Sequence, residues 1–588
     1  MPHVISRRAI LAALLATTAL PRRLSAQTAA PVQPIISGWP RRQPVFAQGG
    51  MVSSQEALAT RVGVDILERG GNAIDAAVAV GFALAVTLPR AGNIGGGGFM
   101  IVHRADRNET RALDFRETAP ASMAKDVYLN DKGEADLNRS QNTGLGIGIP
   151  GTVAGMAMAL ERFGSGQFTL GTLIQPAVAL ARDGFTIGDD LAFSLKQAEA
   201  RLKRYPSAMR IFAMPEGGMM PRGALLRQTD LAETLSGLAV TGTRGFYEGP
   251  LAEKMVNAVN AAGGKWSLDD LKSYKAIERD VVRGSYRGHD IVSMPPPSSG
   301  GVHLVQILNM LEGFDMKAAG HNSADGIHLF AEASKLAYAD RSEYLGDPDF
   351  VKVPVRGLTS KAYAQTLRSK IDPARTRPGQ EIKPGQPQPF ESDQTTHYSV
   401  VDRDGNAVSC TYTLNFSYGV GMVADGTGIL MNNELDDFAA KPGVPNAYGL
   451  VGGDANAPGP GKRPLSSMSP TIVFKAGKPF LVTGSPGGSR IITTVLQVIT
   501  NIIDHDMNVA EATEAVRVHH QWLPDELRVE RGLSVDTMRL LQAKGHKVSV
   551  QQAMGSTHSI VLTPAGFEGA SDQRQSDTLT AGAMFKKR

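Results

Sequence analysis

The feature that most constrains the fold of this chain is the junction before residue 395. There a segment with few apolar residues is followed by a segment in which apolar and polar residues alternate as in a β-strand. Residues 374–394, ARTRPGQEIKPGQPQPFESDQ, are rich in proline, glutamine, glycine and charge. Such a composition predicts a flexible, exposed linker. The following TTHYSVVDRDGNAVSCTYTLN alternates around an Asp-Gly-Asn turn and predicts a hairpin of two strands. Thr395 is therefore predicted to begin a strand directly after a mobile linker.

Thr395 would acquire two reactive groups if the peptide bond after Gln394 were cut. Its hydroxyl could act as a nucleophile, and its new alpha-amine, with a reference pKa near ~8, could accept the hydroxyl proton. A Thr-Thr pair at the start of a strand is also what β-propensity alone favours. The junction by itself therefore leaves a catalytic and a purely structural threonine both open.

The first half of the chain predicts helices around a glycine-led strand. Residues 55–86 have the periodicity of two helices, the second deeply buried, with Asn72 as its N-cap and Asp75 in its first turn. The glycines of residues 92–98 lead into a strand and allow a close backbone approach. Residues 151–371 are dominated by helical patterns, interrupted by a turn at 295–301, and predict helical covering layers.

The last third of the chain, after the predicted hairpin, alternates strands, glycine-rich loops and helices. PFLVTGSPGG predicts a strand that ends in a glycine loop, and SRIITTVLQVITNIID predicts a helix directly after it. Two late strands are predicted around VSVQQ and HSIVLT. Together with the first half, these elements indicate a mixed α/β sheet sandwich.

The N-terminus has the pattern of a secretory leader. Arg7 and Arg8 precede an apolar run and small residues near Ala26, and Ser6-Arg7-Arg8 resembles a twin-arginine signal. A membrane anchor is the alternative, but the apolar run is shorter than the ~20 residues that span a bilayer. We therefore expect cleavage after residues 1–26 and a periplasmic destination, without a membrane anchor.

Charge and metal-ligand patterns exclude several function classes. Residues 1–26 contain four arginines and no acidic residue, so their removal cancels the formal charge of +4 and argues against a nucleic-acid partner. The single cysteine, Cys410, excludes an intramolecular disulfide and is expected to be a small buried strand residue. His397 and the adjacent His519 and His520 lack a metal-binding pattern and are treated as structural. The glycine-rich segments lack the lysine of a phosphate-binding loop.

Seven segments, in order along the chain, carry a resemblance to a known family. They are NAIDAAVAVGFALAVT, GNIGGGGFM, DFRETAP, TTHYSVVDRDGNAV, NNELDDF, RPLSSMSPT and TGSPGGSRI. From about residue 40 to the end, the chain resembles gamma-glutamyltranspeptidases, which belong to the N-terminal nucleophile hydrolase superfamily. The resemblance implies a four-layer αββα sandwich and a precursor that cuts itself between Gln394 and Thr395. Residues 27–394 would form a large subunit, residues 395–588 a small one, and the two would remain together as a heterodimer.

The resemblance also implies an acyl-transfer mechanism at the junction. Thr395 would attack the gamma-carbonyl of glutathione or another gamma-glutamyl amide, and water or an acceptor amino acid or dipeptide would resolve the acyl-enzyme. Thr413 would hydrogen-bond the nucleophile. Gly487 and Gly488 would donate backbone N–H groups to the developing oxyanion, where one donor contributes about 3 kcal/mol. No metal or organic cofactor is expected.

To bind the amino-acid end of the substrate in a site without water, the protein must pair its carboxylate and its ammonium with groups of opposite charge. By resemblance, one set of residues would hold the alpha-carboxylate and a second set the alpha-ammonium. The first set is Arg116, Ser466 and Ser467, and the second is Asn415, Glu434 and Asp437. Glu434 departs from the glutamine of some bacterial relatives, which leaves the preference among acceptors open.

Residues 440–453, AKPGVPNAYGLVGG, resemble the lid loop of some family members, with Tyr448 as the capping aromatic. A lid would exclude bulk water from the site. An ordinary glycine-rich surface loop is the alternative. Two rival functions also stay open: an acylase of the cephalosporin acylase kind on the same scaffold, and an uncleaved binding protein for gamma-glutamyl peptides.

Overall fold

The computed structural model describes residues 42–384, 396–441 and 453–584. The predicted leader, the two residues of the expected cleavage site and Tyr448 lie outside these ranges. Among the described residues, none of the helices combines the length and the apolar character needed to cross a membrane.

Two seven-stranded sheets form the centre of the body that begins at Arg42. The first sheet has the order β1 (Val45–Ala47), β20 (Gly566–Ser571), β19 (His558–Thr563), β15 (Lys478–Thr483), β14 (Thr471–Lys475), β9 (His289–Ser293) and β8 (Val282–Tyr286). The second has the order β21 (Leu579–Gly582), β2 (Gly50–Ser54), β10 (Thr396–Asp402), β11 (Ala407–Thr413), β3 (Gly97–Arg104), β4 (Glu109–Phe115) and β7 (Ile277–Arg279). All pairings in both sheets are antiparallel.

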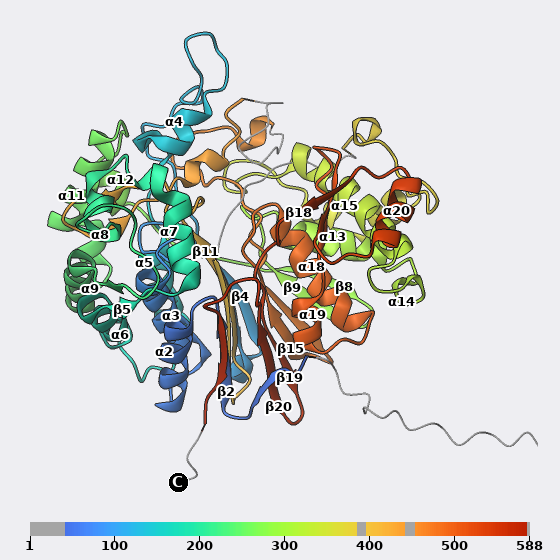
Figure 1. Cartoon of the computed structure of the whole chain (residues 1–588), viewed down its shortest axis with the longest axis horizontal. Coiled ribbons are helices and arrows are strands. Elements are labelled where there is room, and N and C mark those ends of the chain that lie inside the picture. Colours follow the sequence, from blue (N-terminus) through green and yellow to red (C-terminus); the bar gives the residue numbers. More distant parts are fainter. Residues whose placement is uncertain (1–41, 385–395, 442–452, 585–588) are drawn as a thin grey trace, which may run out of the picture. The chain divides into compact units, whose positions relative to one another are not determined.

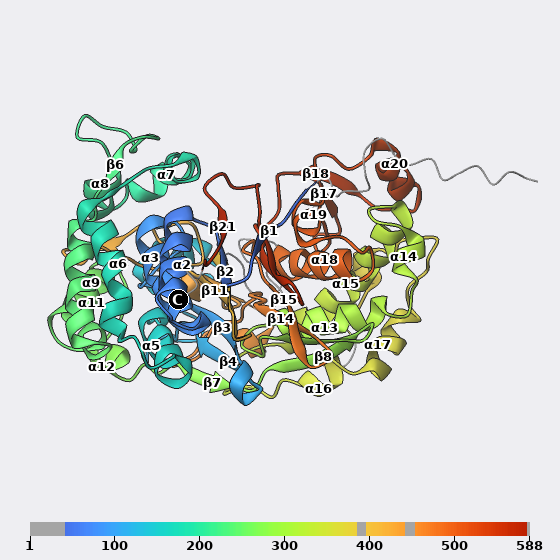
Figure 2. The same ribbon diagram turned by 90° about the horizontal axis from the view of Figure 1, so that it is seen from below.

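Helices cover the outer face of each sheet, and the sheets face each other between them (Figure 1, Figure 2). The second sheet packs against α2 (Ala57–Glu68), α3 (Ala73–Thr87) and α5 (Thr152–Phe163), and the first against α13 (Gly300–Leu311), α18 (Arg490–Ile503) and α19 (Val509–Glu514). Each outer interface has its own apolar core. The predicted αββα sandwich is therefore confirmed.

The remaining helices extend these two outer layers. On the side of the second sheet they are α6 (Leu170–Asp183), α7 (Asp189–Leu202), α8 (Pro206–Phe212), α9 (Thr229–Thr241), α11 (Pro250–Ala261) and α12 (Leu268–Lys272) (Figure 2). On the other side they are α14 (Met316–Ala319), α15 (Ala324–Tyr344), α16 (Val355–Leu358), α17 (Lys361–Arg368) and α20 (Val535–Ala543). The short helix α10 (Arg244–Tyr247) contacts α9, α11 and α12, and α4 (Leu137–Asn142) contacts the 3-10 turn of Glu434–Asp437. Short strands complete the body: β5 (Phe185–Thr186) with β6 (Leu225–Leu226), β12 (Val423–Ala424) with β13 (Ile429–Leu430), and β16 (Val518–His519), β17 (Leu527–Glu530) and β18 (Val548–Gln551).

The predicted helix and hairpin signals are confirmed at the level of individual contacts. Asn72 caps α3 and forms a reciprocal capping box with Asp75, so the start of this fully buried helix is fixed by its own sequence. In the hairpin, Tyr398 of β10 pairs with Cys410 of β11. Cys410 is fully buried, as expected, and burial raises the pKa of its thiol to about 12, which keeps it protonated.

Two sequence expectations are wrong in part. The middle third contains, besides helices, the strands of residues 277–293, which have three to five residues each and show no strict alternation of buried and exposed positions. The part of the predicted linker at 374–384 is not a free exposed segment. Ile382 is 1% exposed, the amide of Thr376 donates to Lys544 O at 2.9 Å, and the amide of Gly379 donates to Asp525 Oδ2 at 2.7 Å. Residues 385–394 lie outside the described ranges.

Candidate functional site

The ends of β10 and β11 frame the predicted nucleophile position. Thr396 begins β10 opposite Tyr412, is fully buried, and donates from its hydroxyl to Gln55 Oε1 at 2.5 Å. Thr413 ends β11 and accepts the backbone N–H of Asn415 on its hydroxyl at 2.8 Å. Gln394 and Thr395 themselves are outside the described residues, so their predicted roles remain predictions.

The glycine run before β3 lets this segment lie directly against the end of β11. A Cβ added to Gly96 would lie 2.1 Å from Thr413 O, and one added to Gly98 would lie 2.4 Å from Tyr412 Cβ. Asn93, just before the run, donates from its amide to Thr413 O at 2.7 Å. The predicted close backbone approach is therefore confirmed, and it holds the backbone of Thr413 in place.

The loop between β15 and α18 contains the two predicted oxyanion glycines. Gly487 has φ +130° and Gly488 has φ +67°, conformations that residues with a side chain rarely adopt. A Cβ on Gly487 would also lie 3.2 Å from Gly555 Cα. Arg490 Nε donates to Gly487 O at 3.0 Å, which fixes the peptide orientation inside the loop. Glycine is therefore required here by conformation and by space.

Arg116 lies at the centre of a buried charged cluster. It is 1% exposed, and its guanidinium donates to Glu434 and Asp437, with further hydrogen bonds to Pro464 O at 3.1 Å and Leu465 O at 3.0 Å. The two predicted substrate sets are thus brought together. The predicted carboxylate-binding arginine is paired with two of the predicted ammonium-binding acids.

Glu117 is a third carboxylate of this cluster, and the sequence analysis missed it. It is fully buried, neither of its oxygens accepts a hydrogen bond from a described residue, and it lies 3.9 Å from Arg116 Nη1. Glu117 directly follows Arg116 in the segment DFRETAP, and this position next to a predicted site residue could have marked it as a candidate. Alternation would have pointed adjacent side chains apart, but β4 ends at Phe115 and frees both to turn the same way.

The cluster contains three acidic side chains and one basic side chain. Burial raises the pKa of Glu117, Glu434 and Asp437, and the neighbouring carboxylates raise that of Glu117 and Asp437 further, while Arg116 opposes the shift. A carboxyl oxygen on each of Glu117, Glu434 and Asp437 lacks a partner among the described residues. A bound cation would relieve this imbalance, because it would stabilise the ionised forms.

Asn415 connects the charged cluster to the end of β11. It has φ +69°, its amide Nδ2 donates to Asn433 O at 2.9 Å, and its backbone N–H donates to Thr413. Glu434 follows Asn433 directly, at the start of a short 3-10 turn. The predicted members Thr413, Asn415 and Glu434 therefore belong to one continuous hydrogen-bonded unit.

The two predicted serines lie on the segment that crosses the guanidinium of Arg116. Ser466 accepts the backbone N–H of Met468 on its hydroxyl at 3.1 Å, and Ser467 accepts Arg341 Nη2 on its hydroxyl at 2.5 Å. Arg341, a buried residue of α15, also donates to Ser299 Oγ at 2.9 Å. Sequence reasoning missed Arg341, since a helical arginine usually lies on a solvated face.

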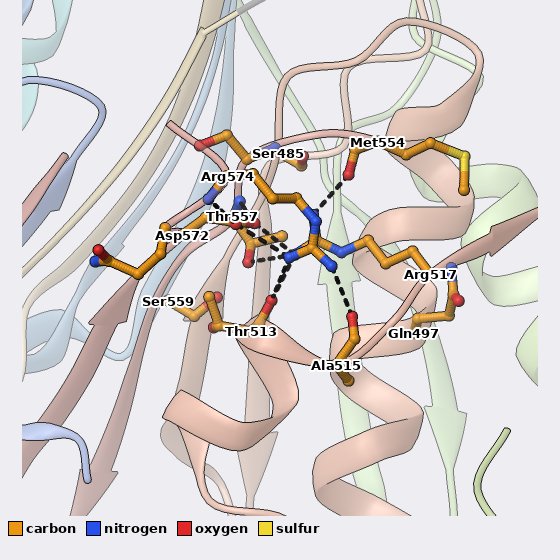
Figure 3. A network of polar contacts seen from close by, with 12 residues as sticks. Ser485, Gln497, Thr513, Ala515, Arg517, Met554, Thr557, Ser559, Asp572 and Arg574 are labelled. Carbon is orange, nitrogen blue, oxygen red and sulfur yellow. Dashed lines mark hydrogen bonds and ion pairs between the residues drawn. The ribbon is translucent and has the colours of Figure 1, made fainter. Parts of the chain in front are cut away.

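A second buried hydrogen-bond network contacts the loop of Gly487 and Gly488 through Ser485 (Figure 3). Arg517 donates to Met554 O at 2.6 Å, to Thr557 Oγ1 at 3.1 Å and to Asp572 Oδ2 at 2.6 Å. This fixes residues 554–557, whose Ser556 amide donates to Ser485 Oγ at 3.1 Å. The network therefore connects the C-terminal strands to the loop that carries Gly487.

The histidines singled out in the sequence make ordinary hydrogen bonds. His397 contacts Thr411 Oγ1 at 2.9 Å and Ser399 Oγ at 3.0 Å. Elsewhere, His328, Glu332 and His546 lie close enough to hold a metal ion. The oxygens of Glu332 already accept from Thr376 and Arg377, and Lys335 lies 3.0 Å from one of them, so this group forms a neutralised hydrogen-bonded cluster.

Comparison with known proteins agrees with this geometry. The sequence profile of gamma-glutamyltranspeptidase matches residues 59–582. The glutathione hydrolase proenzyme of Escherichia coli is 56% identical over 98% of this chain and 99% of its own length.

Two solved structures share the fold. A cephalosporin acylase from Bacillus halodurans has a TM-score of 0.83 at 28% identity, covering 95% of this chain and all of its own. A gamma-glutamyltranspeptidase from Helicobacter pylori has a TM-score of 0.56 at 45% identity, covering 59% of this chain and 97% of its own. With a family profile and a full-length relative in agreement, this chain belongs to the gamma-glutamyltranspeptidase family.

Proposed function

We propose that this protein cleaves the gamma-glutamyl amide bond of glutathione and related compounds, and passes the gamma-glutamyl group to water or to an amine. The observation that carries the proposal is the buried cluster of one guanidinium and three carboxylates beside Thr413. A gamma-glutamyl group brings one carboxylate and one ammonium, and this cluster has one basic and three acidic side chains. The ammonium would pair with the acids and release Arg116 to hold the alpha-carboxylate.

The proposed reaction proceeds through an ester on Thr395. Its hydroxyl oxygen attacks the gamma-carbonyl carbon while its own alpha-amine takes the hydroxyl proton. The N–H groups of Gly487 and Gly488 stabilise the oxyanion. When the C–N bond breaks, the ammonium of Thr395 returns the proton to the leaving amine. Water, or an acceptor amino acid or dipeptide, then attacks the ester and regenerates the hydroxyl.

Maturation by cleavage between Gln394 and Thr395 is part of the proposal, because only cleavage creates the alpha-amine. The mature protein would be a heterodimer of residues 27–394 and 395–588. Intact-mass spectrometry and N-terminal sequencing test this step. We expect a small fragment that begins Thr-Thr-His-Tyr in the wild type and no fragment in Thr395→Ala. Cleavage at the same bond in Thr395→Ala would contradict autocatalysis, and an uncut, inactive wild type would favour the binding-protein alternative.

The similarity to a cephalosporin acylase favours one alternative activity, the hydrolysis of glutaryl amides, which lack the ammonium group. Glu434, Asp437 and Glu117 argue against it, because a glutaryl group brings a carboxylate but no ammonium and would add a fourth acidic group to three buried carboxyls around one arginine. We expect a much higher kcat/KM for gamma-glutamyl-p-nitroanilide than for glutaryl-p-nitroanilide. Equal values would favour the acylase.

The leader pattern of residues 1–26 supports a further proposal, export to the periplasm by the twin-arginine route. Replacing Arg7 and Arg8 by lysine should retain the protein in the cytoplasm, as measured by fractionation of expressing cells. Unchanged export of this variant would contradict the proposed route.

A further inference from the structure

The turn that follows β16, residues 520–525, lies between two structures that the mechanism needs. On one side Gln521 accepts a hydrogen bond from the hydroxyl of Ser489, which directly follows Gly488, and also contacts His519 at the end of β16. On the other side the turn contacts residues 376–382, the last described part of the proposed large fragment, through Trp522 and Asp525. The turn therefore connects the large-fragment segment to the glycine loop.

The contact with the glycine loop is made by directed hydrogen bonds. Gln521 Nε2 donates to Leu523 O at 3.2 Å, which turns its Oε1 towards the loop. There it accepts Ser489 Oγ at 2.7 Å and His519 Nε2 at 2.9 Å, and Thr493 Oγ1 of α18 lies 2.7 Å from His519 Nδ1. Because Ser489 directly follows Gly488, Gln521 holds the residue next to the oxyanion glycines.

The contact with the large-fragment segment centres on one glycine. The amide of Gly379 donates to Asp525 Oδ2 at 2.7 Å, and its carbonyl accepts Trp522 Nε1 at 2.8 Å. His520 accepts the Trp522 amide on Nδ1 at 3.2 Å, so its proton lies on Nε2, 3.3 Å from Asp525 Oδ1. Gly379 is buried, and a Cβ there would lie 2.8 Å from Trp522 O.

Trp522 itself is in a strained conformation, with φ +68°. A tryptophan adopts the left-handed region only where its surroundings enforce it, and such strain costs about 1–3 kcal/mol. The enforcing contacts are the hydrogen bonds to Gly379 and His520. The shape of the turn therefore depends on a segment that precedes the proposed cleavage site in the chain.

We propose that the segment around Gly379 positions the oxyanion loop through this turn, with Trp522, Gln521 and Ser489 as the connecting residues. Docking of Gly379 holds Trp522, the turn directs Gln521, and Gln521 fixes Ser489 beside Gly488. The large fragment thus contributes to transition-state stabilisation through residues that do not touch the substrate. The inference rests on the proposed function of Gly487 and Gly488.

The first test is Gly379→Ala, with Gln380→Ala as the matched control, because Gln380 is the exposed neighbour on the same segment. The probe is hydrolysis of gamma-glutamyl-p-nitroanilide, normalised to the processed fraction measured by mass spectrometry. The new methyl group must displace Trp522, so we expect kcat to fall about tenfold while KM changes less than twofold, since an oxyanion contact acts on the transition state. Gln380→Ala should match the wild type.

A double-mutant cycle tests the connection itself. Ser489→Ala removes the hydroxyl that donates to Gln521, and Ser489→Thr retains a hydroxyl and should restore most of kcat. If the turn transmits the effect, Gly379→Ala should lower kcat little in the Ser489→Ala background. Independent, multiplicative losses would overturn the proposal, as would a Gly379→Ala variant with the kcat of Gln380→Ala.

These experiments distinguish failure of the positioning role from failure of the proposed function. If Gly379→Ala does not accumulate as folded protein, Asp525→Asn replaces it, because it weakens the same contact while it keeps the side-chain volume. A wild type that neither cleaves itself nor hydrolyses the probe would contradict the proposed function. If the wild type is active and kcat is unchanged in both Gly379→Ala and Asp525→Asn, only the positioning role is contradicted.

Discussion

Arg116 shows how far a single residue can be anticipated. The family resemblance of the segment DFRETAP predicted that Arg116 holds the substrate's carboxylate in a site without water; Arg116 is buried, and the role itself stays a prediction. Its ion pairs with Glu434 and Asp437 could not be anticipated, because they join residues that are far apart in the chain and depend on where the 3-10 turn after Asn433 lies. Glu117 and Arg341 were missed because the usual patterns mislead here: alternation would point Glu117 away from Arg116, and a helical arginine such as Arg341 usually lies on a solvated face.

Glu434→Gln should separate substrate binding from chemistry. Burial raises the pKa of Glu434, and recognition of an ammonium requires its ionised form. In the wild type, KM for gamma-glutamyl-p-nitroanilide should therefore rise as pH falls through neutrality. The variant should have a KM about three- to tenfold higher at pH 8 and a flatter KM profile, because one titrating carboxylate is gone. The pH profile of kcat, which we propose depends on the Thr395 amine, should not move, and a shifted kcat profile would contradict this assignment.

Asp436→Asn should change how stability depends on pH. Burial raises the pKa of Asp436 to about 6, and its Oδ2 lacks a partner among the described residues. An acid with a raised folded-state pKa stabilises the folded state below its unfolded pKa, near 4, and this contribution is lost as pH rises through 6. The loss is up to about 3 kcal/mol. In an uncut Thr395→Ala background, urea unfolding should become less pH-dependent between pH 4 and 7 in the variant, and an unchanged slope would contradict the prediction.

At the scale of elements, the sequence identified the helices and strands that have local signals such as a cap, an alternation or a glycine run. The capping box of α3, the alternation of β10 and β11 and the glycines before β3 were all readable. The strands β8 and β9 pair with each other and were missed because both are short; the further partner of β9, β14, lies far along the chain, in the other proposed fragment. The segment at 374–384 was misread because composition cannot report that Gly379 and Ile382 have partners elsewhere.

Gly96→Ala should disrupt the joint between β3 and β11. Its methyl group would lie 2.1 Å from Thr413 O, so a strand end must move, at an expected cost of at least about 2 kcal/mol and with loss of processing. Gly237→Ala is the matched control, because Gly237 lies within α9 with no atom within 4 Å of the added Cβ. There we expect a gain of about 0.5–1 kcal/mol from helix propensity. Thermal melting of both variants checks this, and equal effects would contradict the steric argument.

At the scale of the whole body, both sheets combine strands from the two sides of residue 395. In the first sheet β9 pairs with β14, and in the second β10 lies between β2 and β11. Separating the proposed fragments would break backbone ladders in both sheets and expose both cores. We expect the fragments to elute together in size-exclusion chromatography at 1 M salt and to separate only in denaturant. Separation by dilution or salt alone would contradict this expectation.

The interleaving of strands such as β2, β10 and β11 has a consequence for the lifetime of the protein. The uncut precursor folds as one chain, with its strands joined in the order that assembles the sheets. Once the chain is cut, an unfolded molecule must find its other half by collision before any sheet can close. Unfolding of the mature enzyme therefore becomes a one-way event under dilute conditions. After the proposed cut, the lifetime of the folded protein would then be set by the rate at which it first unfolds, rather than by an equilibrium.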